Sequence, residues 1–241
     1  MCMNGLVIGT VIENYDEKYP GMVQVSYPFF EAAEKVSAWM PVSSGYTGKN
    51  YGVYMLPEKD EQVVVGFIGG DEHSGIVLGS LWNTQNTIPP DVVDEKNSTR
   101  CLVTKGGHSI VFKDGDEGKI TVKSKDGHTV EIDEKAKTIK VSASGGKHKL
   151  TLDEKNKTVD LESGDKLNIK AETISIKGAI SLKGPSVTIE SDNVLMMKGK
   201  QVKLDSSTIK VNGLNTEFTG ANVKVESSGI LTLKGSMTKI N

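Results

Sequence analysis

The second half of the chain alternates between apolar and polar positions. Apolar residues stand two apart in pairs, and most of the positions between them hold Lys, Thr, Ser, Asp or Glu. Because successive side chains of a β-strand point to opposite faces, each pair predicts a short strand with one apolar face. The first six pairs are Ile110/Phe112, Ile120/Val122, Val130/Ile132, Ile139/Val141, Leu150/Leu152 and Val159/Leu161.

Turn-like segments separate these strands and predict tight connections between them. The three segments are 114–118 (DGDEG), 133–137 (DEKAK) and 153–157 (DEKNK). The surrounding sequence repeats three times, with His108, His128 and His148 at the same place in each copy. We therefore expect residues 105–172 to form repeated β-hairpin layers.

The spacing tightens after residue 173. Apolar pairs continue from Ile174 to Leu231 at about seven residues per step, which is typical of a solenoid or fibre. A left-handed single-chain β-helix of the hexapeptide class has a stricter and shorter repeat. A right-handed one stacks apolar residues on several sides of each coil. Here each strand offers one apolar face, which cannot bury a core within one thin chain, whereas three chains wound about a common axis could enclose one.

We therefore predict that residues 173–241 form a triple-stranded, intertwined β-helix. Its narrow interior suits Val, Ile and Leu, and of the aromatic residues only Phe112 and Phe218 lie beyond position 83. The expected trimer core consists of Ile174, Ile176, Val187, Ile189, Val194, Val202, Leu204, Ile209, Val211, Val223, Val225, Leu231 and Leu233.

The first region, residues 1–95, contains short β-rich runs bounded by Gly, Pro, Asn and Asp, without a long helical period. The runs are 5–13, 22–30, 37–42, 62–70 and 75–82. Five strands at this spacing predict a small antiparallel barrel of the OB type. The whole chain is therefore expected to be all-β, with residues 96–104 as a linker between the OB-fold barrel and the hairpin layers.

Charge separates the two regions as well. Residues 1–95 carry 4 Lys and Arg against 13 Asp and Glu, a net charge of −9, whereas residues 96–241 carry 25 against 18, a net charge of +7. Many OB barrels bind oligonucleotides through a basic groove, because phosphate neutralisation supplies most of the sequence-independent affinity. An acidic barrel argues against nucleic acid as the partner.

Several residues of the first region stand in a distinctive order and spacing. They are Pro57, Asp60, Glu61, Gly69, Gly70, Asp71, Gly79 and Ser80. This pattern resembles the OB domain of contractile-injection spikes, a family that includes phage baseplate assembly protein V and the valine-glycine repeat protein (VgrG) of type VI secretion. The resemblance covers residues 6–83, and the repeats beyond residue 105 are similar to the family's trimeric needle in pattern alone.

The resemblance implies a structural protein, a homotrimeric central spike in the tail or baseplate of an injection particle assembled in the bacterial cytoplasm. The barrel would contact hub and tube proteins, and the needle would make transient contact with the target cell envelope. Some spikes of this family hold iron near the tip through paired histidines. The C-terminal sequence GILTLKGSMTKIN contains no His or Cys, so a separate tip protein of the PAAR-repeat type is expected instead.

The candidate chemistry is sparse, and we expect neither catalysis nor a cofactor. No GxSxG motif, HExxH motif or phosphate loop occurs. The three periodic histidines are interpreted as polar residues that precede each strand. The alternative is an ion site, because a trimer could bring three copies of His108, His128 or His148 to its axis.

Two other functions remain open from the residues alone. One is a single-chain β-helix enzyme that acts on polysaccharide, with the barrel as a carbohydrate or partner module. The other is a receptor-binding fibre, although residues 215–241 lack the aromatic-rich composition of a globular head.

Overall fold

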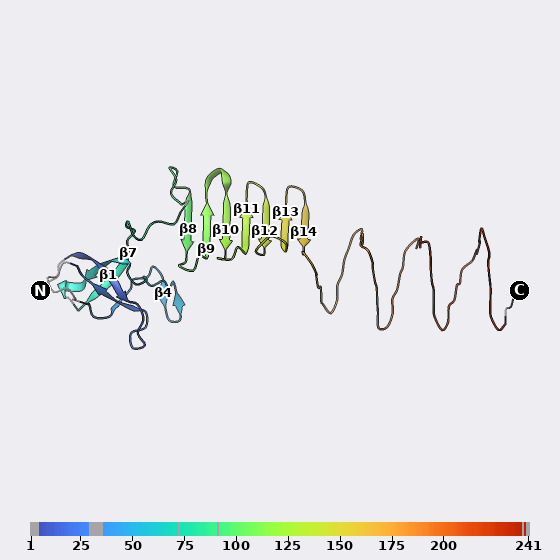
Figure 1. Ribbon diagram of the computed structural model, residues 1–241, viewed down its shortest axis with the longest axis horizontal. Helices are drawn as coiled ribbons and strands as arrows, with labels where there is room; N and C mark the ends of the chain where they lie inside the picture. The colour runs from blue at the N-terminus through green and yellow to red at the C-terminus, as the bar shows by residue number, and fades with distance from the viewer. Residues whose placement is uncertain (1–4, 29–35, 72, 91, 238, 240–241) are drawn as a thin grey trace. The chain divides into compact units, whose positions relative to one another are not determined.

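The computed structural model describes residues 5–28, 36–71, 73–90, 92–237 and 239. Its contacts divide the chain into two units, residues 1–170 and residues 171–241. Every regular strand of the described residues lies in the first unit (Figure 1). The only helices found there are two short 3-10 turns, η1 (Ile68–Gly70) and η2 (Gly115–Glu117). None of the described helical segments is long or apolar enough to cross a membrane.

Five strands of the first region form a nearly closed barrel. They are β1 (Leu6–Glu13), β2 (Met22–Ser26), β3 (Met40–Pro41), β6 (Gln62–Phe67) and β7 (Gly75–Ser80), arranged in the order β3-β2-β1-β6-β7. A parallel bridge between Val42 and Val77 brings the two edges together. The predicted OB-type barrel is confirmed. The end of the second predicted run, Phe29 and Phe30, lies outside the described residues.

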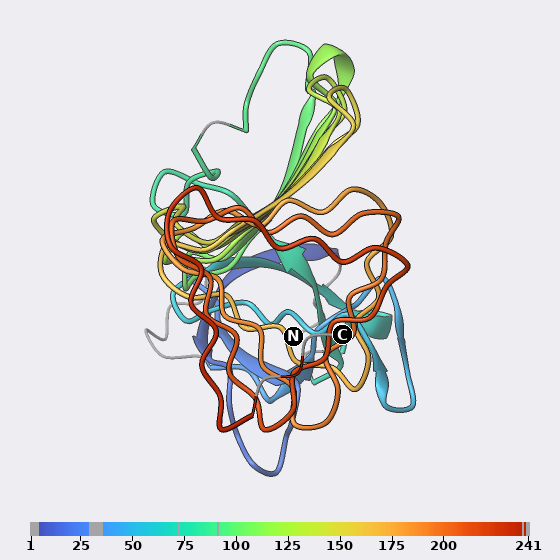
Figure 2. The ribbon, with the colours of Figure 1, turned by 90° about the vertical axis from the view of Figure 1, so that its right-hand side faces the viewer.

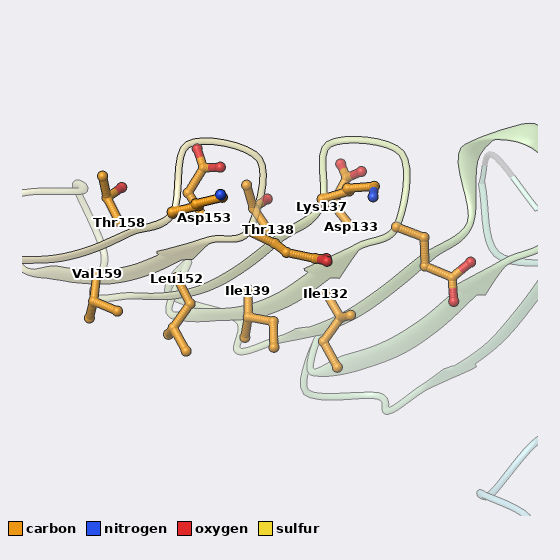
Figure 3. Close-up of a pocket in the computed structure, with 12 residues that line it drawn as sticks. Ile132, Asp133, Lys137, Thr138, Ile139, Leu152, Asp153, Thr158 and Val159 are labelled. Carbon is orange, nitrogen blue, oxygen red and sulfur yellow. The ribbon is translucent and has the colours of Figure 1, made fainter.

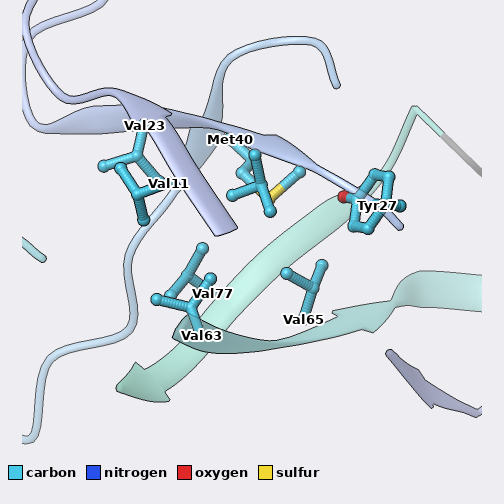
Figure 4. Close-up of a cluster of buried hydrophobic side chains, with 8 residues drawn as sticks. Val11, Val23, Tyr27, Met40, Val63, Val65 and Val77 are labelled. Carbon is cyan, nitrogen blue, oxygen red and sulfur yellow. The ribbon is translucent and has the colours of Figure 1, made fainter. Parts of the chain in front are cut away.

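The barrel encloses an apolar core, because every second side chain along its strands points inward. Inward-facing positions converge on one interior (Figure 4), and this cluster consists of Val11, Val23, Val25, Tyr27, Met40, Val63, Val65 and Val77. Six of these side chains, all valines, are fully buried, which accounts for the regular strand pairing around them. Burial raises the pKa of the Tyr27 hydroxyl to about 12.

A small hairpin, β4 (Thr47–Gly48) and β5 (Tyr51–Gly52), extends from the barrel and was not predicted. Its strands are too short to show an alternating pattern. The turn places Asn50 at a positive φ of 66°, a conformation that Asn adopts more readily than most residues. The rings of Tyr46 and Tyr51 contact each other with centroids 5.4 Å apart.

The second region forms a seven-stranded antiparallel sheet in which each strand pairs with the next along the chain. The strands are β8 (Thr99–Val103), β9 (Ser109–Lys113), β10 (Lys119–Lys123), β11 (Thr129–Asp133), β12 (Thr138–Ser142), β13 (Lys149–Asp153) and β14 (Thr158–Glu162). The predicted hairpin layers are confirmed, and they join edge to edge. Strand β8 lies within the segment that the sequence marks as a linker, because Arg100 and Cys101 hide its alternation.

Backbone hydrogen bonds connect the turns on one margin of this sheet. In each case an amide at the start of one turn donates to a carbonyl oxygen of the preceding layer. The bonds run from Asp114 N to Ser98 O (2.9 Å), from Glu134 N to Gly118 O (2.8 Å) and from Glu154 N to Lys137 O (3.0 Å). The layers are therefore tied together outside the strands as well as within them.

The second unit, residues 171–241, has extended backbone but contains no strand among its described residues. The chain rises and falls in successive broad loops (Figure 1). Each described residue of this unit is exposed, including all its apolar pairs. A strand requires a neighbour for its N–H and C=O groups, so these residues lack the partner strands that their pattern requires.

The hairpin loops provide a test of the local backbone. Lys137 and Lys157 occupy the last position of their loops at positive φ values of 57° and 56°. A side chain is strained there, so Lys137→Gly should raise the free energy of unfolding by about 0.5–1 kcal/mol, measured by urea denaturation. Lys135→Gly, in the same loop at negative φ, is the matched control. It should be neutral or destabilising, and equal effects of both substitutions would contradict this account.

Candidate assembly face

Strand pairing aligns the apolar pairs of the sheet into two continuous rows on one face. Row 1 consists of Arg100, Phe112, Ile120, Ile132, Ile139, Leu152 and Val159, each directly opposite the next. Row 2 consists of Leu102, Ile110, Val122, Val130, Val141, Leu150 and Leu161. We call the two rows together the apolar face. Figure 3 shows Ile132, Ile139, Leu152 and Val159 of row 1 pointing to the same side.

The apolar face is exposed within the single chain. Apart from Leu150, which is half-buried, the apolar residues of this face have exposed fractions from 37% at Leu102 and Ile110 to 70% at Val159. Full burial of one such side chain contributes about 1.5–3 kcal/mol, and large contiguous apolar patches on a protein surface mark interaction sites. The apolar face is therefore a candidate contact surface.

From β10 onward the opposite face of the sheet is polar, and it carries ion pairs between neighbouring strands. Lys119 Nζ lies 2.8 Å from Asp133 Oδ2 and 3.5 Å from Glu131 Oε2. Further along, Lys149 Nζ lies 3.1 Å from Glu162 Oε1. The pKa of the Asp133 carboxyl is lowered, first by its hydrogen bond with Lys119 and then by the one from the Ala136 amide. Such a face suits contact with water.

The three periodic histidines connect successive layers on the second margin of the sheet. The His108 ring Nδ1 accepts a hydrogen bond from the Lys125 amide (3.3 Å), and the His128 Nδ1 accepts one from the Ser144 amide (3.1 Å). In the third layer, His148 Nδ1 lies 3.2 Å from Ser163 Oγ. Each histidine therefore bonds to the turn of the following layer, which explains why the three recur with the hairpins.

The sequence pattern indicated polar residues that precede each strand, but it did not reveal that their imidazole rings bond to the next layer. Within one chain, the described residues contain no group of three or more His, Cys, Asp or Glu side chains arranged to hold a metal ion. The three histidines are separated into different layers. An ion site formed by His108, His128 or His148 from three chains stays a prediction.

The distinctive residues of the first region shape the turns of the barrel. Pro57 is buried, and its carbonyl oxygen accepts a hydrogen bond from Asn14 Nδ2 (3.1 Å). The Asp60 amide donates to Val11 O (2.8 Å), and the Val11 amide donates to Glu61 O (2.9 Å). These bonds fasten the loop before β6 onto β1.

The turn between β6 and β7 requires the next part of the motif. Gly69 and Gly70 both have positive φ values, 63° and 76°, which favour glycine. Asp71 then accepts hydrogen bonds from the His73 amide (3.0 Å) and from Ser74 Oγ (2.8 Å). The backbone bond from His73 is the first of several causes that lower the pKa of Asp71.

The last two motif residues follow an irregularity in β7. The pairing of β6 with β7 shifts between Val64 and Val65, so Leu78 is an extra residue in the strand. Gly79 comes directly after it and Ser80 ends the strand. A bulge of this kind bends and twists a strand, which helps a short sheet to curve into a barrel.

Comparison with known proteins identifies this barrel. Residues 7–82 match the type VI secretion system/phage-baseplate injector OB domain. Those residues are similar to an injector OB domain, and the match covers less than half of the chain. The resemblance to VgrG-like spikes that the sequence indicated is thereby confirmed for the barrel.

Several curated proteins are similar to parts of this chain. The spike protein VgrG1c of the type VI secretion system of Pseudomonas aeruginosa is 30% identical over 86 residues, which are 35% of this chain and 12% of that protein. VgrG3 of Vibrio cholerae serotype O1 is 30% identical over 105 residues, or 40% and 10%. The actin cross-linking toxin VgrG1 of Vibrio cholerae is 28% identical over 124 residues, or 46% and 11%. The chain thus spans a small fraction of each relative.

The residues expected in the trimer core occupy the second unit and face solvent there. Their exposed fractions lie between 53% at Val202 and 71% at Val194. Within one chain the structure brings none of the described members of this set into a buried cluster. Their place in a trimer core stays a prediction.

Replacement of a histidine tests the contact between layers. In His128→Phe the Ser144 amide loses its acceptor, so its hydrogen exchange should accelerate about tenfold, in keeping with roughly 1 kcal/mol for one hydrogen bond. The Lys125 amide, held by His108, serves as the internal control and should keep its rate. Unchanged exchange at Ser144 would contradict the proposed contact.

Acid should weaken the polar face. Because the folded pKa of Asp133 lies below its ordinary value of about 3.9, its contribution to stability is present above that pH and is lost as pH falls through the folded pKa. The urea midpoint should therefore fall less between pH 7 and pH 2 in Asp133→Asn than in the wild type. Lys119→Met, which removes the first cause, should reduce the pH dependence in the same direction. An undiminished fall in both variants would contradict the assignment.

Proposed function

We propose that this protein is the structural spike subunit of a contractile injection apparatus, a phage tail baseplate or a related bacteriocin or secretion machine. Two observations carry the proposal: the apolar face of the sheet, and the exposure of the apolar pairs in residues 171–241. The injector OB domain at residues 7–82 supplies the context of an injection machine.

The occupant of the apolar face is a further copy of the chain, and three copies form the spike. Two apolar positions per strand make one wall of a core, and a cyclic trimer supplies the other walls. The extended residues 171–241 obtain their strand partners from the neighbouring chains, which forms the intertwined β-helix. The mechanism is mechanical: a stiff prism transmits the force of contraction to a small area of the target envelope.

The partners follow from this role. The barrel docks on hub and tube proteins of the baseplate, and the C-terminal end receives a tip protein of the PAAR-repeat type. The expected site of action is the tail or baseplate of the particle. Enzymatic activity is not part of the proposal, and the actin cross-linking named for one relative belongs to that protein, of which the matched segment covers 11%.

The exposure of the second unit disfavours the first alternative, a single-chain β-helix that acts on polysaccharide. A single-chain helix buries apolar residues between its own coils, whereas every described residue of the second unit is exposed. The relatives VgrG1c and VgrG3 are named as spike proteins, which favours the spike over a receptor-binding fibre.

The oligomeric state tests the proposal. The wild type should have a native mass of three times the 25.9 kDa chain. Ile189→Asp should abolish the trimer, because three like charges would meet in the core. Thr188→Asp, on the opposite parity of the same segment, is the matched control and should leave the trimer intact. A monomeric wild type would refute the spike, whereas a trimeric Ile189→Asp would refute the intertwined core.

A further inference from the structure

Arg100 interrupts the apolar face at the first strand of the sheet. It stands in row 1 directly opposite Phe112, and every other position of the two rows is apolar. Its Nη1 donates to Asp114 Oδ2 at 2.5 Å, and Asp114 follows β9 immediately. The pair is open to water in the single chain, since the two side chains are 57% and 63% exposed.

The other ion pairs of the sheet lie elsewhere. Lys113 and Lys119 are opposite each other on the polar face, one residue out of phase with row 1. Lys113 Nζ lies 3.2 Å from Glu117 Oε2 in the same turn that contains Asp114. The turn between β9 and β10 therefore contributes to two ion pairs, one on each face. Only the pair of Arg100 belongs to a surface that a second protein surface is expected to cover.

The apolar rows alone do not determine how one copy of the chain is aligned along another. The corresponding positions of successive hairpins hold Ile110 and Phe112, then Val130 and Ile132, then a pair of leucines. If one copy were displaced along another by one hairpin, each apolar side chain would meet a similar one, and little apolar contact would be lost. A single polar position in an otherwise apolar interface removes this ambiguity, because displacement leaves a charge against hydrocarbon.

We propose that Arg100 and Asp114 form a charged layer between copies of this chain, which fixes the register of the apolar faces at the β8 end. The inference rests on the proposed trimer. The pair carries both signs of charge, so the same surface on a second copy complements it. The guanidinium has five N–H donors, and the bond through Nη1 leaves others for Asp114 of the neighbouring copy.

The energetic consequence distinguishes this pair from a surface ion pair. When an interface covers the layer, removal of one partner leaves an uncompensated charge in a dry contact, which is strongly destabilising. Removal of both partners in favour of apolar groups is neutral or favourable for stability. A pair that stays in water contributes little, whichever partner is removed.

Thermal unfolding of the trimer tests the charged layer. Asp114→Ala should lower the melting temperature of the trimer by about 10 °C or more, because it strands three arginines. Glu117→Ala breaks the ion pair on the polar face of the same turn and is the matched control, with a shift within about 2 °C. Addition of Arg100→Met to Asp114→Ala should restore most of the loss, and Asp114→Glu should preserve the wild-type value.

Pulsed electron paramagnetic resonance measures the alignment of the copies separately. A nitroxide attached to the Lys125→Cys variant, in a background with Cys2→Ser and Cys101→Ser, should give a single interchain distance when Arg100 and Asp114 are present. The distribution should broaden or split in the restored Arg100→Met/Asp114→Ala trimer, which lacks the charged layer. An unaltered single distance would overturn the assignment of register to this pair.

The outcomes separate the inference from the proposed function. A wild type that is not trimeric refutes the spike, and it also refutes the charged layer, which requires the trimer. A trimeric wild type in which Asp114→Ala and Glu117→Ala melt alike refutes the charged layer and leaves the spike intact. Circular dichroism of Asp114→Ala below its melting transition establishes that the strands have formed before either conclusion is drawn.

Discussion

A five-residue strand can turn only two or three side chains to each of its faces, and this geometric limit governs the chain beyond the barrel. The repeated strands place two apolar residues on one face and polar residues on the other. One sheet of this kind has nothing within its own unit to cover the apolar side. The exposed rows are the direct result, and the need to cover them underlies the proposed assembly.

The barrel shows the opposite solution to the same problem. Its five strands curve around, with a bulge in β7 and glycines at the β6–β7 turn, until the edges meet. All the buried apolar side chains of the described residues belong to this barrel. The barrel therefore has a buried core of its own, whereas the apolar rows of the repeats are left without one within the single chain.

The sheet is tied together across its layers on both margins. One margin uses backbone amides that donate to the preceding turn, and the other uses imidazole nitrogens that accept from the following turn. Both sets of bonds lie outside the strand ladder and resist the separation of one hairpin from the next. A stack bonded in this way is suited to bear a load along its length, which is what the proposed role as a spike requires.

Much of this protein could be read from its sequence, because alternation and turn chemistry act locally. The strands at residues 109–162, the apolar pairs and the OB-type barrel followed from positions two apart and from the spacing of glycines and acidic residues.

Three features depended on contacts between residues distant in sequence. Strand β8 was hidden because Arg100 occupies a place that the pattern reserves for an apolar residue. The bonding of each histidine to the next layer required the turns to be stacked in space. The position of the Arg100–Asp114 pair on the apolar face emerged only from the register of β8 with β9, since parity along one strand cannot say which residues of another strand lie beside it.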